Sequence, residues 1–472
     1  METSTKLALR PSLRLYPTPT GVVFFDRDPY GIEARYVTKP ALALTLALFD
    51  GKRTVAEVAN AISKIFDMDI KEVKHKLVSI VNAYVHEGLL VDANQINNKW
   101  AAVKPPVPEL SDLLKYNVGK VSLSRPRAPY SIVYIVTHRC NQRCIYCYAN
   151  ASPDAPREEW LPAQRLETLF KEMGQHGVAM INFSGGDPFV RKDFPDLAIM
   201  ALDHGIFPWI STKGRVSNQV AFRLARAGLP LIQISIDSLN DEVQDYLCNT
   251  KGALDNLLAT LNAFLEAGVD VCTHTVVTSA NIKEIPESVR TLLAMGVRTC
   301  VLSPYVRSFG RHTDSLFASE EQWAALFRWY ETECDRTRVQ LRYASAVRQS
   351  LNSQSRGDEW NPSGCTGGRE GFAILPDGKV ALCERLAYYP DGLIGSVRDH
   401  SLLEMWSSNE MLRMVYPPQE LFAGTPCEQC PEYERCIRDG MRCYVRAVLA
   451  YQRLFAPDPL CPRAPRHPIR FL

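Results

Sequence analysis

One short stretch, CNQRCIYC at residues 140–147, constrains this chain more than any other part of its sequence. Its cysteines, Cys140, Cys144 and Cys147, are spaced so that three thiolates can wrap one face of an iron–sulfur cube. Because a [4Fe–4S] cluster needs four ligands, three cysteines leave one iron open to something else. A structural zinc site is the alternative, with His138 as a fourth ligand, although such sites usually use paired CxxC or Cys/His motifs.

The aromatic Tyr146 before the third cysteine completes a pattern, CxxxCxΦC, that resembles the signature of the radical S-adenosylmethionine (SAM) superfamily. The resemblance implies a [4Fe–4S] cluster on Cys140, Cys144 and Cys147, with S-adenosylmethionine chelated by the fourth iron. It also implies that an electron from the cluster produces a 5′-deoxyadenosyl radical, which removes hydrogen from a substrate. An external donor such as flavodoxin or ferredoxin would supply that electron.

Composition limits where such a protein can work. The 472 residues predict two or three domains, and the net charge of +2 argues against a strongly electrostatic nucleic-acid partner. Residues 1–10 contain no apolar signal-peptide core, and no run of eighteen apolar residues predicts a membrane span. We therefore expect a soluble, cytoplasmic protein with no membrane partner, whose fourteen cysteines serve metal or cluster ligation and not disulfides.

Residues 1–95 have the pattern of a separate N-terminal unit. Three short β-type runs come first, at 13–16, 22–25 and 34–38, and three helical patterns follow. Pro40 suits the first turn of the first helix, and a capping box of Thr54 and Glu57 opens the second. The third helical pattern covers residues 70–87. Residues 96–128 follow as a proline-containing linker.

This N-terminal arrangement resembles a winged-helix unit, specifically the PqqD-like peptide-recognition domain fused ahead of many peptide-modifying radical enzymes. The phrase FDGKRTVAEVANAISKIF carries most of that resemblance. It implies a leader peptide that adds as a strand beside residues 34–38 and packs against the helix at 73–84. A DNA-binding winged helix is the alternative, but thirteen Lys and Arg against eleven Asp and Glu in residues 1–100 are too balanced for strong phosphate binding.

From Ser131 to about residue 340, short apolar runs alternate with amphipathic helical patterns, which predicts an α/β fold with a parallel sheet. Six such units resemble the partial (β/α)6 barrel of the radical SAM family, a domain we place at 129–340. In such barrels the chemistry sits at the C-terminal ends of the strands. Strands are expected at 132–136, 179–183, 207–211, 231–236, 271–277 and 299–303, and helices at 163–173, 254–267 and 285–294.

Several candidate cofactor contacts follow these strands. Where the family has GGEP, this chain has GGDP at 185–188, whose backbone would bind the methionine amino group of the cofactor. The resemblance suggests ribose or carboxylate contacts at the other strand ends. Simple strand-end capping is the alternative for Ser235 and Asp237. The candidates are Tyr146, Gly185, Gly186, Asp187, Ser211, Ser235, Asp237, Asn281 and Arg311.

A second cysteine pattern begins at Cys365 and resembles the SPASM extension of radical enzymes, CX9–15GX4C…CX2CX5CX3C…C. The departure is six residues between Cys436 and Cys443, where the family usually has three. The resemblance implies two auxiliary [4Fe–4S] clusters in a domain at 341–472, whose hairpin turns at residues 377–378. One cluster would use Cys427, Cys430, Cys436 and Cys461, and the other Cys365, Cys383 and Cys443 with no fourth cysteine. A pair of zinc knuckles is the alternative.

Four cysteines, Cys248, Cys272, Cys300 and Cys334, have no ligand spacing, so we expect buried free thiols. Cys248 is also a candidate hydrogen donor, because it follows the fourth strand.

The three segments together resemble a radical SAM peptide maturase, which oxidatively modifies, for example crosslinks, a ribosomally made precursor peptide. Two alternatives remain: a related enzyme that oxidises a small molecule or a protein side chain, and an iron–sulfur redox sensor that binds DNA. The sequence predicts neither a catalytic acid or base nor the bond that forms.

Overall fold

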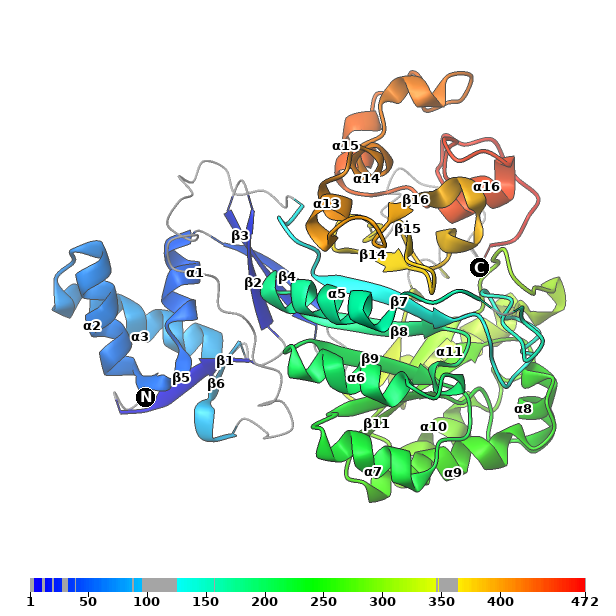
Figure 1. Cartoon of the computed structure of the whole chain (residues 1–472), viewed down its shortest axis with the longest axis horizontal. Helices are drawn as coiled ribbons and strands as arrows, with labels where there is room; N and C mark the ends of the chain where they lie inside the picture. Colours follow the sequence, from blue (N-terminus) through cyan, green and yellow to red (C-terminus); the bar gives the residue numbers. More distant parts are fainter. Residues whose placement is uncertain are drawn as a thin grey trace. The chain divides into compact units, whose positions relative to one another are not determined.

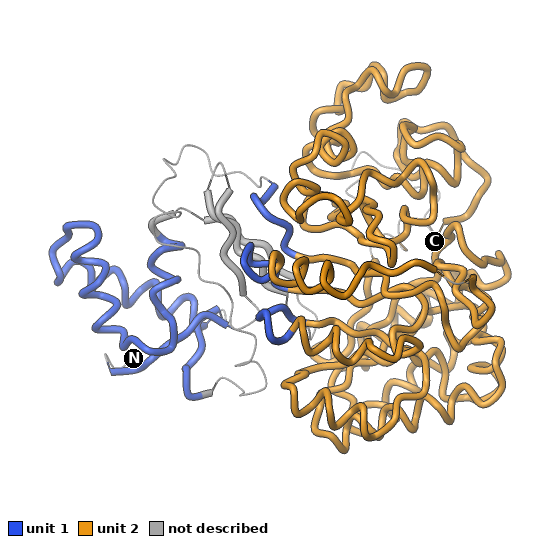
Figure 2. The backbone as a smooth tube through the Cα atoms, in the orientation of Figure 1, with its two compact units in different colours: residues 1–130, 174–179, 202–207 blue, residues 131–173, 180–201, 208–472 orange. Residues whose placement is uncertain are grey.

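The computed structural model of the 472-residue chain describes residues 4–10, 13–18, 21–27, 33–38, 40–86, 89–95, 125–156, 158–344, 347 and 364–471. Of the expected linker, residues 96–124 lie outside the described residues. Figure 2 shows two compact units. Unit 1 contains Met1–Tyr130, Gly174–Ala179 and Leu202–Phe207, and unit 2 contains Ser131–Met173, Met180–Ala201 and Pro208–Leu472.

In unit 1, the three strands expected near the N-terminus form an antiparallel sheet in the order β2-β3-β4. Among the described strands, β4 pairs on one side only, with β3. A second sheet, in the order β5-β1-β6, was not predicted from the sequence, because the polar run of β5 lacks alternating apolar residues. The strands are β1 Lys6–Leu9, β2 Leu13–Thr18, β3 Gly21–Arg27, β4 Glu33–Thr38, β5 Asp50–Thr54 and β6 Leu90–Asp92.

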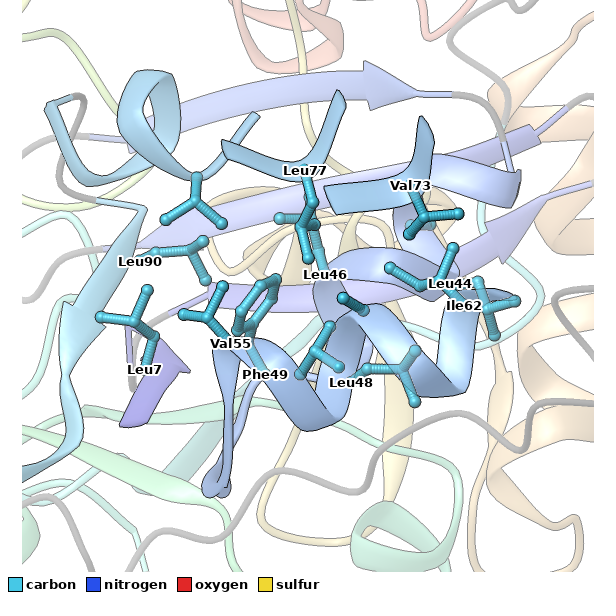
Figure 3. Close-up of a cluster of buried hydrophobic side chains, with 14 of the residues drawn as sticks. Leu7, Leu44, Leu46, Leu48, Phe49, Val55, Ile62, Val73, Leu77 and Leu90 are labelled. Atoms are coloured by element: carbon cyan, nitrogen blue, oxygen red, sulfur yellow. The ribbon is translucent and has the colours of Figure 1, made fainter. Parts of the chain in front are cut away.

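The helices of unit 1 match the predicted patterns: α1 is Pro40–Ala47, α2 is Val55–Phe66 and α3 is Ile70–His86. The capping box is formed, since Thr54 and Glu57 each accept a hydrogen bond from the other's backbone N–H. Side chains of the helices and of β1 and β6 share one core (Figure 3), which includes Leu7, Leu44, Phe49, Leu77 and Leu90.

Unit 2 is built on a ten-stranded sheet in the order β13-β12-β11-β10-β9-β8-β7-β14-β15-β16. All six predicted strands are present in it, and β7 pairs with β8 in parallel, as do the successive strands from β9 to β13. Their side chains are largely buried on both faces, as a covered parallel sheet requires. The strands are β7 Ser131–Thr137, β8 Met180–Gly185, β9 Phe207–Thr212, β10 Leu231–Ser235, β11 Asp270–Val277, β12 Thr299–Pro304 and β13 Val339–Leu341.

Helices connect these strands (Figure 1), and those predicted at 163–173, 254–267 and 285–294 are present as α5, α9 and α10. No helix among the described residues is long and apolar enough to pass through a membrane. The helices are α5 Ala163–Gln175, α6 Phe194–Asp203, α7 Asn218–Arg226, α8 Asp241–Cys248, α9 Ala253–Glu266, α10 Ile285–Ala294 and α11 Glu320–Thr332.

The C-terminal segment continues the sheet of the barrel. Strand β14 (Gly371–Ile374) pairs in parallel with β7, and the predicted hairpin joins it to β15 (Lys379–Ala381) through Asp377 and Gly378. Strand β16 (Leu393–Ser396) completes the edge. Nothing in the sequence had indicated the pairing of β14 with β7. Short helices follow: α13 Leu402–Ser407, α14 Asn409–Val415, α15 Tyr433–Arg438 and α16 Tyr444–Tyr451.

Candidate functional site

The loop with the first three cysteines directly follows β7 and is fixed by backbone hydrogen bonds. Cys140 N–H donates to the Ser152 carbonyl over 3.2 Å. Two more N–H groups, of Arg143 and Ile145, donate to carbonyls at the end of α8 over 3.1 and 3.0 Å. These backbone hydrogen bonds fix the path of the loop between β7 and α8.

The thiols of Cys140, Cys144 and Cys147 lie close enough for their charges to interact. Burial raises the pKa of Cys140 to about 12 and raises that of Cys147. The pKa of Cys144 is raised by a contact with the Cys248 thiol and then by burial. Ionisation of such thiols requires nearby positive charge, which iron supplies when it binds.

Gly310 and Arg311 pack against this loop. A Cβ on Gly310 would lie 2.1 Å from the Cys147 carbonyl oxygen, so only glycine fits there. The Arg311 guanidinium donates to the carbonyls of Cys144 (2.7 Å) and Ala151 (2.5 Å). The sequence predicted Arg311 as a cofactor contact, and in the structure its guanidinium binds the backbone of the loop that carries the three cysteines.

The glycines after β8 bring a second backbone segment against the loop. The N–H groups of Gly186 and Asp187 donate to the carbonyls of Thr137 and Arg139 over 2.7 and 3.0 Å. A Cβ on Gly186 would lie 1.8 Å from the Arg139 oxygen. With these N–H groups used, the segment has carbonyl oxygens to offer an amino group. Gly185 takes the left-handed φ of +118° that this turn requires.

The buried Asp187 side chain ties this turn to the end of β9. Its carboxylate accepts hydrogen bonds from the Thr212 hydroxyl (2.8 Å), the Lys213 N–H (2.8 Å) and the Phe189 N–H (3.0 Å). Burial raises its pKa, and the same hydrogen bonds oppose that shift. Asp187 therefore holds the turn after β8 and the end of β9 in fixed positions.

Tyr146, Lys213 and Asp237 form a buried polar group beside the cysteines. The Lys213 ammonium forms an ion pair with Asp237 and donates to the Tyr146 hydroxyl, which itself donates to Asp237. Burial alone would lower the pKa of Lys213, but attraction to Asp237 and Tyr146 holds it well above its usual value. Tyr146 and Asp237 are among the candidates chosen from the sequence, and Lys213 directly follows β9.

The other predicted cofactor contacts have mainly internal partners. The Asn281 amide donates to the carbonyls of Asp237 and Val276 and accepts from Thr278, so all its hydrogen-bonding capacity is used. The Ser211 hydroxyl accepts from Gln233 over 2.7 Å. Ser235 ends β10, opposite His274 of β11.

The unpatterned cysteines Cys248, Cys272 and Cys300 are buried, as predicted, whereas Cys334 is half-buried. The Cys248 sulfur accepts a hydrogen bond from Gln244 over 3.0 Å and packs with Cys144. The ring of His138, the suggested fourth zinc ligand, packs edge-on against Tyr388 with centroids 5.6 Å apart.

A further polar group near the loop was missed by sequence reasoning. The Glu384 carboxylate accepts hydrogen bonds from Tyr148 (3.3 Å) and Ser184 (3.1 Å). The sequence did offer one signal, because each of the three residues is adjacent to a candidate site residue. Tyr148 follows Cys147, Ser184 precedes Gly185, and Glu384 follows Cys383.

The C-terminal cysteines lie in two groups. Electrostatic interactions link Cys365, Cys383 and Cys443, and separately link Cys427, Cys430, Cys436 and Cys461. These are the same two sets that the SPASM resemblance implied. The longer spacing before Cys443 contains a turn whose Gly440 carbonyl accepts the Cys365 N–H over 2.7 Å.

No group of three or more His, Cys, Asp or Glu side chains within the described parts of the chain surrounds the position of a single metal ion. In a [4Fe–4S] cluster each cysteine binds a different iron, so its thiols need not converge on one ion. The buried thiols and close backbone approaches around residues 140–147 therefore suit such a cluster.

Family comparison agrees with this geometry. Residues 134–292 match the radical SAM superfamily, and residues 365–431 match the SPASM iron-sulfur cluster-binding domain. The chain has a radical SAM domain and a SPASM domain. The radical SAM domain implies a [4Fe–4S] cluster with S-adenosylmethionine, and the SPASM domain implies auxiliary iron–sulfur clusters. The cysteines Cys436, Cys443 and Cys461 lie beyond the matched SPASM residues.

Three relatives align with most of this chain. Mycofactocin maturase MftC of Mycolicibacterium smegmatis is 28% identical over 369 residues, covering 75% of this chain and 86% of that protein. PqqA peptide cyclase of Granulibacter bethesdensis is 26% identical, covering 73% and 90%. AdoMet-dependent heme synthase of Methanosarcina barkeri is 26% identical, covering 72% and 98%.

The fold also matches a solved structure. Streptococcus suis SuiB bound to precursor peptide SuiA superposes with a TM-score of 0.67 at 15% identity, over 97% of this chain and 100% of that one. The two chains therefore share a fold along nearly their whole length.

Proposed function

We propose that this chain is a radical SAM/SPASM enzyme that oxidatively modifies a ribosomally synthesised precursor peptide, for example by crosslinking it. The observation that carries the proposal is the gathering of ten cysteines into three groups, one in the barrel and two beyond it. Its relatives include a peptide cyclase, and SuiB was solved with a precursor peptide.

The barrel residues have distinct roles in this proposal. Cys140, Cys144 and Cys147 would hold the cluster, which with S-adenosylmethionine supplies a radical that removes a hydrogen atom from the peptide. Arg311 holds the loop by its two carbonyl contacts. Carbonyl oxygens of the GGDP turn would accept hydrogen bonds from the amino group of the cofactor. The Lys213–Asp237 ion pair would provide fixed charges beside the cofactor.

The C-terminal cysteines would hold the two auxiliary clusters as grouped above, which provide a place for an electron from the oxidised peptide. The set of Cys365, Cys383 and Cys443 leaves one position for another side chain or for substrate. An external donor such as flavodoxin or ferredoxin would reduce the barrel cluster, in a reducing compartment such as the cytoplasm.

Unit 1 would bind the leader part of the precursor. Strand β4 pairs with β3 alone among the described strands, so a peptide could add to its other side by backbone hydrogen bonds. Binding there raises the effective concentration of the attached core peptide at the barrel.

The test is a reaction of the anaerobically reconstituted full chain with dithionite, S-adenosylmethionine and short peptides encoded near its gene. We expect 5′-deoxyadenosine and a peptide that has lost hydrogen, with the same core peptide reacting far more slowly without its leader. The Cys144→Ala variant is the negative control. Failure of the wild-type chain to cleave S-adenosylmethionine would contradict the proposal.

A small-molecule substrate is the second candidate, because one relative is a heme synthase that aligns over 98% of its own length. It predicts turnover of a tetrapyrrole substrate with no dependence on any leader peptide, so the same assay separates the two functions.

A further inference from the structure

Arg442, directly before Cys443, is a buried cation without an acidic partner. Arg442 is only 7% exposed, and no Asp or Glu among residues 364–471 forms an ion pair with it. One of its terminal nitrogens, Nη2, is buried with no hydrogen-bond partner. A buried charge is costly unless an opposite charge compensates it.

The remaining contacts of Arg442 hold the guanidinium in place without neutralising it. Nη1 donates to the carbonyls of Leu454 (2.9 Å) and Ala456 (3.0 Å). The guanidinium carbon lies 3.8 Å from the ring centroid of Tyr444 and 4.9 Å from that of Phe422. Carbonyl dipoles and ring faces compensate a cation partly, and they leave Nη2 free to donate.

The negative partner that this site lacks is present once the neighbouring cysteines bind iron. Hydrogen bonds place Arg442 beside these cysteines. Met441, directly before it, donates its N–H to the Cys436 carbonyl over 2.9 Å. The Thr425 hydroxyl accepts the Cys427 N–H over 3.2 Å and donates to the carbonyl of Phe422, the residue whose ring faces the guanidinium. A cluster held by four thiolates carries a net negative charge, and Cys427 and Cys436 belong to the only C-terminal group with four cysteines in the described chain.

Arg446, in the first turn of α16, provides the contrast. Its guanidinium forms a bidentate pair with Asp458, whose side chain is fully buried, at 2.6 to 3.1 Å. Asp458 also accepts the N–H of Cys443 over 2.9 Å. The arginine beside the three-cysteine group is therefore neutralised within the protein, whereas Arg442 is not.

We propose that Arg442 is the counter-ion and N–H donor of the auxiliary cluster held by Cys427, Cys430, Cys436 and Cys461, and that it raises the reduction potential of that cluster. Net charge and hydrogen bonds to sulfur set the potential of such clusters. The inference rests on the proposed function, because it takes these cysteines as cluster ligands. Arg442 acts as a positioning and tuning residue, and it does not touch the substrate.

The experiment measures iron content and midpoint potentials by redox titration followed with electron paramagnetic resonance. It uses the full chain with Cys140, Cys144 and Cys147 replaced by Ala, so that only auxiliary clusters contribute. In Arg442→Gln we expect one of the two midpoints to become more negative, with about a tenfold change in its reduction equilibrium, or about 59 mV. Arg442→Lys keeps the charge and should keep the midpoint.

Arg453→Gln is the matched control. Arg453 also donates to two carbonyls, of Ala423 and Leu421, but is exposed, so its loss should shift neither midpoint. If Arg442→Gln loses the cluster, retention of iron and midpoint in Arg442→Lys supports the proposal. Loss of iron in the Lys variant as well would contradict the proposal. It would show that Arg442 is needed for its hydrogen bonds to the carbonyls of Leu454 and Ala456 and not for its charge.

Two other results would overturn the proposal. One is an unchanged pair of midpoints in an iron-replete Arg442→Gln variant. The other is zinc in place of iron in the parent protein, which would refute the auxiliary-cluster assignment itself and is measured before any Arg442 variant is made.

Discussion

The cysteines of the radical site and those of the C-terminal segment are brought together in different ways. Three come from one loop of eight residues, positioned by backbone hydrogen bonds to Ser152 and to the end of α8. The other seven come from positions scattered between residues 365 and 461, and the buried charges of Arg442 and Asp458 and the half-buried Arg446 lie among them. A local site depends on the chain spacing of its ligands, whereas a scattered one depends on tertiary contacts and on compensated charge.

The sharpest test of this difference is Cys144→Ala. Because all three ligands of the first site share one loop, we expect complete loss of S-adenosylmethionine cleavage with the auxiliary iron retained. Iron quantitation and 5′-deoxyadenosine analysis on the same preparation measure both. Loss of iron from every site would show that the two regions are not independent.

Asp458→Asn tests the C-terminal cysteine groups, whose ligands are scattered along the chain. The substitution breaks a buried ion pair and leaves Arg446 uncompensated, so we expect a loss of roughly 3 kcal/mol in unfolding free energy and release of iron from the Cys443 group. Urea denaturation and iron analysis measure these effects. Asp314→Asn, whose side chain is 70% exposed in its pair with Arg307, should change stability little. Equal effects of the two variants would refute a special role for the buried pair.

Gly310→Ala tests whether the local loop tolerates displacement. The new Cβ would meet the carbonyl oxygens of Cys147 and Tyr148 at 2.1 and 2.5 Å, so the loop must move. A shift on the order of 1 Å reduces the rate about 100-fold, measured as 5′-deoxyadenosine formation. At Gly252 a Cβ meets no atom within 4 Å, so Gly252→Ala costs about 1 kcal/mol of stability for its left-handed φ of +67° but should keep the rate. Full activity of Gly310→Ala would mean that the loop position is not limiting.

The smallest expected effect concerns the barrel beneath the loop. Burial lowers the pKa of His274 to about 4, and its ring nitrogen lies 2.9 Å from the Ser303 hydroxyl. Below about pH 6.5 the unfolded chain binds a proton that the folded chain does not, so stability falls as pH falls toward 4. At pH 5 this amounts to about 2 kcal/mol.

Urea denaturation at pH 7 and pH 5 measures this loss, which His274→Gln should remove. His75→Gln, at an exposed position on α3, should leave the difference as in the parent chain. The same pH dependence in all three proteins would contradict the assignment to His274.

Much of this architecture could be predicted from the sequence, because its signals are local. The strands of the barrel are short apolar runs, and the capping box at Thr54 is a four-residue motif. The grouping of the C-terminal cysteines came from their resemblance to the SPASM extension. Each of these features depends on residues that are close in the chain or on a distinctive ligand type.

The partners of polar side chains could not be predicted in this way. Asn281 and Arg311 occupy expected places at strand ends, but their hydrogen bonds go to protein carbonyls that the sequence does not mark. Arg442 and Asp458 carry no motif, and their surroundings arise only when the loop around Ala456 folds back on α16. Long-range packing decides these contacts.

The pairing of β14 with β7 also bears on truncation. Strand β7 carries the radical-site loop and has β8 on one side and β14 on the other (Figure 1). A chain shortened before Gly371 would present β7, with its buried Ile132 and Tyr134, as an unprotected edge open to pairing with other molecules. The barrel and the segment after it thus form one folding unit, and a shortened chain is expected to aggregate.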